Sequence, residues 1–254
     1  MMQKEIDVTA LGELLIDFTE NGVSSQGNAL LEANPGGAPC NVLAMLGKLG
    51  KKTAFIGKVG NDQFGNMLRN TIESVGIDAE GLVIDDKVHT TLAFVHTYPD
   101  GDRDFSFYRN PGADMMLRKE EVSLEKICAS KIFHFGTLSF THAGIRTASQ
   151  YAIQCAKEAG ALISFDPNLR EPLWENLEDA RKAIEYGMEC CDILKISDNE
   201  LTFMTGEKDY DKGAVLLQQK YQIPLVCVTL GKDGAGHTIR GLRLKRSHFC
   251  RKTR

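Results

Sequence analysis

The stretch that decides the fold is Asn34 to Asp62, NPGGAPCNVLAMLGKLGKKTAFIGKVGND. It predicts a glycine turn, a helix of small and apolar residues, and a strand that ends in glycine. Gly36 and Gly37 have no Cβ, so their backbone can take a positive φ or lie directly against a ligand. Asn41 follows at the predicted start of the helix and looks buried. Its amide either caps the helix or binds a ligand rich in hydroxyl groups.

Apolar strand-like runs alternate with helical patterns over most of the chain. The runs are IDVTALG, TAFIGKVG, KIFHFG, ALISFDPN, DILKIS and PLVCVTLG. Helical patterns lie at 64–75, 142–159, 177–190 and 211–221. This alternation predicts an α/β fold with a mostly parallel sheet and helices on both faces. Ligands of such folds bind beyond the carboxyl ends of the strands.

Two segments interrupt the alternation. Residues 16–34 are polar and extended, and residues 90–109 alternate about a Pro99-Asp100-Gly101 turn. Such a turn between alternating runs predicts a β-hairpin.

The chain length, the net charge and the residues near the N-terminus restrict the class of protein. With 254 residues the chain is near the upper end for one domain. The net charge of -4 indicates neither a nucleic-acid partner nor a membrane partner. Glu5, Asp7 and Glu13 interrupt the first apolar stretch, so no secretory signal is expected.

The cysteines point to a reducing compartment. There are seven of them, with no CxxC pair and no matching histidine spacing. An odd count without such spacing predicts neither a disulfide framework nor a zinc site. We therefore expect a cytoplasmic protein.

The stretch Asn34 to Asp62 resembles the sugar-binding signature of the ribokinase-like (phosphofructokinase B-type) carbohydrate kinases. In that signature a glycine pair and an asparagine precede two further glycines, which correspond here to Gly50 and Gly60. The resemblance continues to about Gly234 through GELLID, FYRNPGADMML, DPNLREPLW, LKISDNELTFMTG and VTLGKDG. FYRNPGADMML and DPNLREPLW are similar to the fructokinase branch in particular. The resemblance implies a three-layer sandwich with a mostly parallel central sheet. It also implies a small β-sheet lid, built near 16–34 and 90–109, that covers the sugar and often mediates dimerisation.

The resemblance assigns the substrate-binding residues Asp17, Gly36, Gly37, Asn41, Phe107, Arg109, Asp166 and Arg170. Asp17, just past the first strand, would accept hydrogen bonds from two hydroxyls, or else only form a turn. Arg109 points at the sugar or its phosphate, or is a solvated hairpin arginine, while Phe107 covers the apolar side of the ring. Asp166 and Arg170 lie near the γ-phosphate and the sugar, or form a structural turn held by an Asp–Arg pair.

ATP and Mg²⁺ are the implied cofactors, and the implied cofactor-binding residues are Lys195, Glu200, Thr229, Gly231 and Gly234. Glu200 would hold Mg²⁺ through water. Ser197 stands where the family has an asparagine. The alternative for Glu200 is an exposed carboxylate that favours the helix dipole. The glycines of the TLGKDG turn would let the backbone approach the nucleotide.

The family's G-A-G-D motif, which supplies an anion cradle and the catalytic base, does not occur in the sequence. Gly234-Ala235-Gly236-His237 has similar letters but comes too early, so no catalytic residue is identified. From Arg240 the chain is basic and unlike the family, and no strand-helix continuation is expected after Gly234. We therefore expect an incomplete, C-terminally truncated ribokinase-like domain over 1–239 and a basic tail over 240–254.

Together these features predict a fructokinase-like phosphotransferase that uses ATP to phosphorylate the 6-hydroxyl of fructose, with little or no activity expected of this chain. Within enzymes, 2-keto-3-deoxygluconate kinase and ribokinase are the alternatives. Outside enzymes, the alternative is a non-catalytic sugar-binding or dimerising protein. The expected partners are a small-molecule sugar and a second copy of the chain bound through the lid, with no nucleic acid and no membrane.

Overall fold

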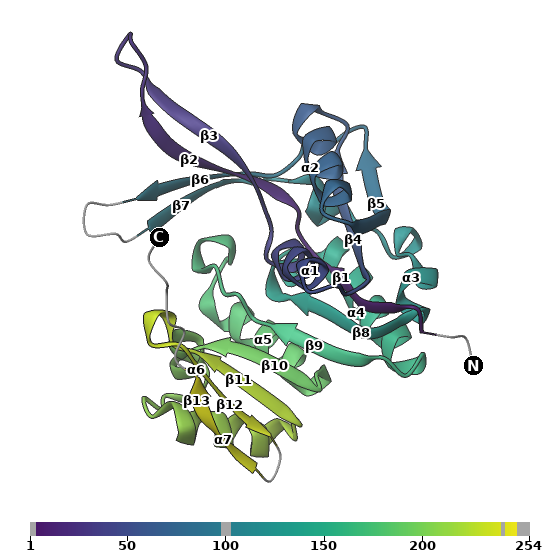
Figure 1. Cartoon of the computed structure of the whole chain (residues 1–254), viewed down its shortest axis with the longest axis vertical. Coiled ribbons are helices and arrows are strands. Elements are labelled where there is room, and N and C mark those ends of the chain that lie inside the picture. The colour runs from purple at the N-terminus through teal and green to yellow at the C-terminus, as the bar shows by residue number, and fades with distance from the viewer. Residues whose placement is uncertain (1–3, 98–102, 240–241, 248–254) are drawn as a thin grey trace. The chain divides into compact units, whose positions relative to one another are not determined.

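The computed structural model describes residues 4–97, 103–239 and 242–247, which fall into two compact units (Figure 1). Unit 1 lies within Met1–Phe133 and Leu138–Ala161, and unit 2 lies within His134–Thr137 and Leu162–Arg254. The predicted extent of one family domain, 1–239, stays a prediction.

Unit 1 contains most of the strands. They are β1 (Ile6–Leu11), β2 (Leu15–Val23), β3 (Ala29–Gly36), β4 (Thr53–Gly60), β5 (Ile77–Asp85), β6 (Leu92–Thr97), β7 (Arg103–Tyr108) and the first part of β8 (Ser130–Gly136). Its α-helices are α1 (Ala38–Lys48), α2 (Gln63–Ser74), α3 (Leu124–Cys128) and α4 (Ala143–Glu158). Unit 1 also has the short 3₁₀ helices η1 (Ala113–Met116) and η2 (Lys119–Glu121). A third, η3 (Thr137–Phe140), has its first residue in unit 2 and the others in unit 1.

The larger sheet of unit 1 has helices on both faces. Its strands follow the order β8-β1-β4-β5, with β1 and β4 parallel and β4 and β5 parallel. Val8 and Phe55 pack with Leu43 of α1 and Ile72 of α2 in one apolar core. The next side chain of β1, Thr9, points to the opposite face and donates a hydrogen bond to a carbonyl of α3. The layered α/β arrangement predicted from the sequence is therefore confirmed.

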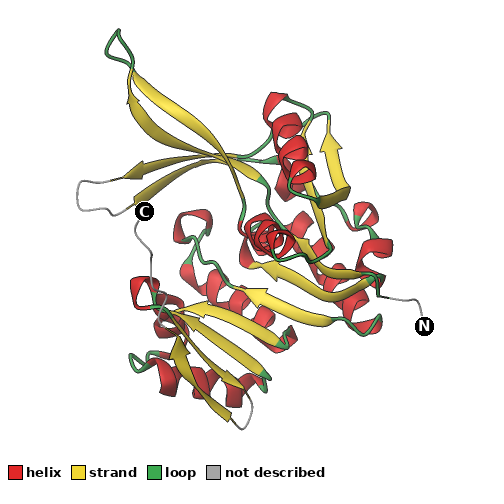
Figure 2. Ribbon diagram, viewed as in Figure 1, coloured by secondary structure: helices red, strands yellow, loops and turns green. Residues whose placement is uncertain are grey.

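A second, smaller sheet of unit 1 has the order β3-β2-β6-β7 (Figure 2). β2 pairs with β3 and β6 with β7 in antiparallel fashion, while β2 and β6 are parallel. The hairpin predicted over 90–109 is confirmed, although its turn at 98–102 lies outside the described residues. The polar segment 16–34 supplies the other two strands, because its alternating side chains suit a sheet with one solvated face.

Unit 2 continues the alternation of strand and helix. Its elements are β9 (Leu162–Asp166), η4 (Glu171–Leu173), α5 (Leu177–Cys190), β10 (Ile193–Ser197), α6 (Asp198–Thr205), α7 (Tyr210–Tyr221), β11 (Leu225–Thr229), η5 (Gly231–Asp233), β12 (Ala235–Ile239) and β13 (Leu242–Ser247). The sheet order is β13-β12-β11-β10-β9-β8. β9, β10 and β11 are parallel, whereas β12 and β13 are antiparallel additions at the edge.

The chain after Gly234 forms strands that the sequence analysis did not predict. β12 and β13 add an antiparallel hairpin beside β11, which is not the strand-helix continuation of the family and leaves the extent of the domain a prediction. Charged residues are unusual in most strands but common on the edge strand of a sheet. The basic composition of residues 242–247 therefore did not predict β13. The six strands and four helices predicted from the sequence are all present, with bounds that differ by a few residues. No helix in the described ranges has the length and apolar character needed to cross a bilayer.

Candidate active site

The diglycine turn lies where β3 gives way to α1. Gly36 is the last residue of β3, and Gly37 precedes α1 with a φ of 120°. A Cβ on Gly36 would overlap the carboxylate of Asp17, and a Cβ on Gly37 would overlap the carbonyl oxygen of Glu13. The turn is therefore in contact with two acidic residues. Only glycine fits at Gly37, where φ is positive and the neighbouring atoms are backbone, while a side chain at Gly36 would displace the carboxylate of Asp17.

Asp17 lies within β2 and not just past the first strand, because the chain begins a new strand at Leu15. It pairs with Ala93 on β6, which in turn pairs with Phe107 on β7. Side chains of directly paired residues lie on the same face of a sheet. Asp17 and Phe107 therefore share one face of the sheet, with the small, buried Ala93 between them.

Asn41 does not lie where the sequence suggested. It is exposed, and its backbone N–H donates to the carbonyl of Gly37 at 3.1 Å. The helix begins at Ala38, whose N–H donates to Glu13 Oε1 at 2.8 Å. The expectations that Asn41 is buried and that it caps α1 are both wrong, because the cap comes from another segment. Ligand binding by the Asn41 amide stays a prediction.

Arg109 is buried in an ion pair with Asp114. Its guanidinium is 2.6 Å from Asp114 Oδ2, and the two side chains are 3% and 2% exposed. It also donates to Thr141 Oγ1 at 2.7 Å and to the carbonyl of Leu138 at 3.0 Å. The alternative of a solvated hairpin arginine is wrong. These partners accept hydrogen bonds from all three guanidinium nitrogens. Contact between Arg109 and the sugar stays a prediction.

Asp166 ends β9 and pairs with lysine. Lys195 Nζ lies 3.1 Å from its carboxylate, and the N–H of Asn168 donates to the same side chain at 3.2 Å. Burial raises the pKa of Asp166, and Glu200 adds to the rise while Lys195 opposes it. The turn after β9 is thus fastened to β10 through Lys195. Arg170 immediately precedes η4 and donates to the carbonyl of Leu169 at 3.2 Å.

Glu200 lies in the first turn of α6 and is buried. Its two oxygens accept the N–H groups of Leu169 at 2.7 Å and Ser197 at 2.8 Å. Ser197 in turn caps the helix by accepting the N–H of Glu200, which completes a capping box. The alternative of an exposed carboxylate is therefore wrong, and the serine at the family's asparagine position serves as the cap.

Unit 2 offers carboxylates suited to a divalent cation held through water. Asp166 and Glu200 lie near enough for Glu200 to raise the pKa of Asp166, and a hard cation would relieve that repulsion. Each Glu200 oxygen already accepts a backbone N–H, which favours contact through water over direct ligation. No group of three or more histidine, cysteine or acidic side chains is assembled for a metal within the described ranges.

The TLGKDG turn follows β11. Gly231 and Gly234 have φ values of 54° and 97°, a region that favours glycine. The turn is closed by the N–H of Leu230, which donates to the carbonyl of Gly234 at 2.8 Å. Thr229 pairs with Ser197 at the ends of the parallel strands β11 and β10. Carboxyl ends of neighbouring parallel strands are where such sheets bind ligands.

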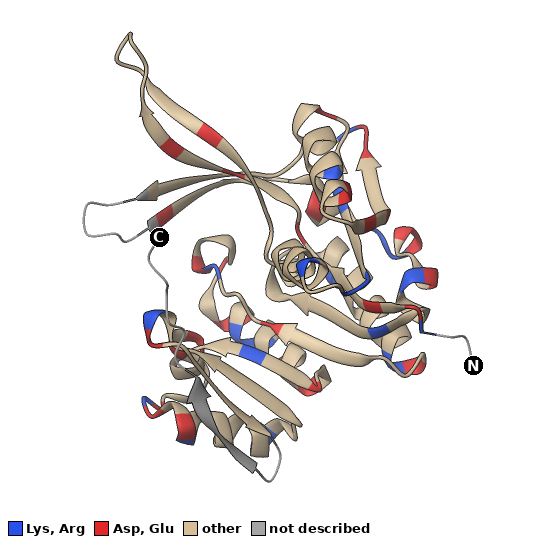
Figure 3. Cartoon of the chain, viewed as in Figure 1, with Lys and Arg blue, Asp and Glu red and all other residues tan. Residues whose placement is uncertain are grey.

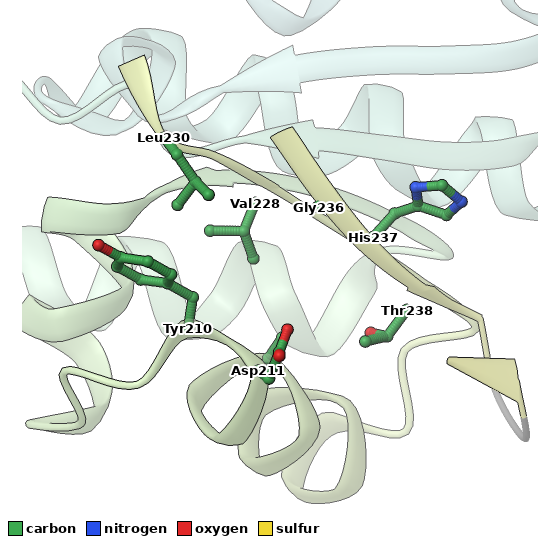
Figure 4. Close-up of a pocket in the computed structure, with 8 residues that line it drawn as sticks. Tyr210, Asp211, Val228, Leu230, Gly236, His237 and Thr238 are labelled. Carbon is green, nitrogen blue, oxygen red and sulfur yellow. The ribbon is translucent and has the colours of Figure 1, made fainter. Parts of the chain in front are cut away.

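His237 does not open a helix. It lies in β12 opposite Cys227, so the letters Gly-Ala-Gly-His form a strand and no anion cradle. A small pocket lies between α7, with Tyr210 and Asp211, and the strands β11 and β12 (Figure 4). It has room for about one water molecule, far too little for a nucleotide.

A larger hollow in unit 1 is lined by both apolar and charged residues, with Lys58 among them. Lys58, which is 3% exposed, donates to Asp85 at 3.3 Å, to Glu121 at 2.9 Å and to the carbonyl of Met116 at 3.0 Å. These contacts use all three protons of the ammonium group. Lys58 therefore has its hydrogen-bond donors satisfied by the protein itself.

Sequence reasoning missed Glu13 and Asp114, which contact the turn and the arginine. Glu13 had one available signal, a glutamate between glycine and leucine in the otherwise apolar GELLI. A charged residue in an apolar run is buried only where it is paired or bonded. Asp114 lies within the quoted segment FYRNPGADMML, but nothing in that segment indicates that it pairs with Arg109.

The chain belongs to the pfkB family of carbohydrate kinases, whose family model matches residues 5–238. It is 47% identical over 230 residues to probable fructokinase-2 of Arabidopsis thaliana, a match that covers 89% of this chain and 70% of the relative. Among solved structures, it resembles fructokinase with bound ATP from Xylella fastidiosa, with a TM-score of 0.84 and 31% identity, covering 94% of this chain and 72% of that one. The fructokinase of Vibrio cholerae O395 bound to fructose, ADP and calcium gives a TM-score of 0.82 at 29% identity and covers 95% of this chain and 76% of its own.

Proposed function

We propose that this chain is a sugar kinase of the fructokinase type, with ATP as phosphoryl donor and the 6-hydroxyl of fructose as acceptor. One observation carries the proposal: Asp17 lies against the Gly36–Gly37 turn and shares a face of the smaller sheet with Phe107. A carboxylate accepts hydrogen bonds from sugar hydroxyls, and an aromatic ring covers the apolar side of the sugar. The likeness to named fructokinases supports fructose over the other sugars considered.

The charges that β2 and β3 carry on the Asp17 face favour an uncharged sugar. By strand register these are the acidic residues Asp17 and Glu32, and neither strand has a basic residue (Figure 3). Arg109, the arginine that would otherwise attract a sugar phosphate, is engaged by Asp114. Like charges repel, so a phosphorylated sugar would bind this sheet less well than fructose.

The nucleotide residues of the proposal lie in unit 2. Lys195 and Glu200 stand at β10 and α6, and the turn of Gly231 and Gly234 follows Thr229. Bound Mg²⁺ would neutralise phosphate charge, with Glu200 and Asp166 as its residues of contact through water. Arg170 is proposed to contact phosphate.

The proposal includes a homodimer formed through the smaller sheet. On the face opposite Asp17, Phe94 contacts Tyr108 with ring centroids 5.1 Å apart, and Tyr108 is 67% exposed. Leu31 on β3 is 46% exposed and lies on the same face by strand alternation. Apolar side chains exposed together are typical of interfaces.

A cytoplasmic location is also part of the proposal. Cys40, Cys128, Cys155, Cys190, Cys191 and Cys227 are free thiols in the part of the chain that the structure describes. Free thiols persist in reducing compartments, and disulfides form in oxidising ones. The non-catalytic alternative is not favoured by the comparisons, because the named relatives are kinases.

Replacing Asp17 with asparagine should weaken fructose binding by about 1–3 kcal/mol, because a charge-assisted hydrogen bond is lost while the shape is kept. Titration calorimetry with fructose measures this change. Asp104→Asn is the matched control, since Asp104 is exposed on β7 and its register with His96 places it on the opposite face. Equal fructose affinity in the two variants would leave Asp17 with a structural role only, and the proposal would lose its main support.

A further inference from the structure

Glu13 is a buried carboxylate that contacts the diglycine turn. It lies in the link between β1 and β2 and is 3% exposed. Its Oε1 accepts the N–H of Ala38, the first residue of α1. Gly37, at the capping position, has no side chain to accept such a bond. Glu13 therefore supplies from a distant segment the cap that the turn lacks.

The backbone of Glu13 packs against the same turn. A Cβ on Gly37 would overlap the carbonyl oxygen of Glu13, so the two backbones are in close contact. Gly36, one residue earlier, is in equally close contact with the carboxylate of Asp17. Two glycines thus separate Glu13 from the proposed sugar ligand Asp17. Because Glu13 and Asp17 contact the same turn, we infer that a shift of Glu13 would move the backbone against which Asp17 packs.

The groups that face Glu13 leave its charge only partly balanced. Asp114 of η1 repels it, Arg109 after β7 attracts it, and the buried thiol of Cys40 faces it from α1. Arg109 is already bound to Asp114. Burial raises the pKa of Glu13 to about 7; the backbone N–H groups of Glu13 and Ala38 and the charge of Arg109 oppose the rise, while Asp114 adds to it. This pKa lies near neutral pH.

We propose that Glu13 is a positioning residue of the sugar site, whose negative charge holds the Gly36–Gly37 turn and the start of α1 in the shape that receives the sugar. This inference rests on the proposed sugar-binding function of the same turn. A hydrogen bond from Ala38 to an ionised carboxylate is roughly twice as strong as one to a neutral acceptor. Sugar binding therefore favours ionised Glu13 and releases a proton from it.

Folding and binding make opposite demands on Glu13. Its pKa is higher in the folded chain than its ordinary value of 4.5, so its contribution to stability is complete below pH 4.5 and is lost as the pH rises through about 7. Glutamine keeps the shape of the protonated side chain and carries no charge to bury. Glu13→Gln should therefore melt at a higher temperature than the parent chain at pH 8, yet bind fructose more weakly.

Calorimetric titration of the whole chain with fructose tests the inference at pH 6, 7 and 8 in two buffers of different ionisation enthalpy. For the parent chain we expect affinity to rise about 3- to 10-fold from pH 6 to pH 8, with proton release at pH 7. For Glu13→Gln we expect the same low fructose affinity at every pH, as in the parent chain at pH 6, and no proton release. Glu20→Gln, at an exposed position of β2, is the matched control and should behave as the parent.

The outcomes separate the two proposals. A Glu13→Gln chain with the parent's affinity and proton release overturns the inference and leaves the sugar site intact, as does a lower melting temperature with unchanged affinity. If the variant does not fold, a flat pH profile of the parent chain overturns the inference by itself. Absence of fructose binding by the parent overturns the proposed function, and the inference with it.

Discussion

Replacing Asp114 with alanine should lower the free energy of unfolding by about 3–5 kcal/mol, because it leaves the guanidinium of Arg109 buried without its counter-charge. The Arg109 side chain is 3% exposed, so water cannot replace the lost carboxylate. Urea unfolding followed by circular dichroism measures the change. Arg69→Ala is the matched control: its pair with Glu73 is 51% and 46% exposed, and removal of such a pair costs about 0–1 kcal/mol.

A double variant separates structure from sugar binding at Arg109. Replacing a buried ion pair by apolar residues of similar volume is often tolerated, so Arg109→Met with Asp114→Leu should recover much of the lost stability. A folded double variant with normal fructose affinity would confine Arg109 to a structural role. Equal losses of unfolding free energy in Asp114→Ala and Arg69→Ala would contradict the claim that the buried Arg109–Asp114 pair matters more for stability than an exposed pair.

The second large effect concerns turnover. The 254-residue sequence has no G-A-G-D motif, and the family resemblance assigns to that motif the base and the anion cradle. A general base is typically worth about 10²–10⁴ in rate, and an anion-stabilising donor about 10²–10³. We therefore predict turnover near background for a polypeptide of these 254 residues alone, and a gain of at least about 10²-fold when a family segment with G-A-G-D is appended.

A coupled assay of ADP release with fructose and ATP·Mg²⁺ compares the two polypeptides. The appended segment with asparagine in place of the motif's aspartate is the control, and it should fall back toward the rate of the unextended chain. Comparable rates with and without the segment would show that a residue within the 254 acts as the base. His237→Ala would then test the histidine of Gly-Ala-Gly-His directly.

The pattern of the sequence was enough for the layered fold. Runs such as TAFIGKVG and KIFHFG alternate with helical stretches, and a strand-helix alternation leaves a parallel sheet as the structure that buries both kinds of apolar face. The hairpin over 90–109 was equally clear, because its turn residues and its two-residue period are local signals. The glycines of the two turns were also predictable, since a positive φ is a property of single residues.

The tertiary structure alone decided which charged groups are paired and which are exposed. Arg109 is buried against Asp114, and Asp166 pairs with Lys195, which is 29 residues away in the sequence. Asn41 is exposed, and its helix is capped instead by Glu13 from the link between β1 and β2. Burial and ion pairing depend on which segments fold together, and that long-range information is absent from the local pattern of residues. The sequence therefore determined the elements and their order, while the packing of those elements determined the burial and the partners of Glu13, Asp114 and Asp166.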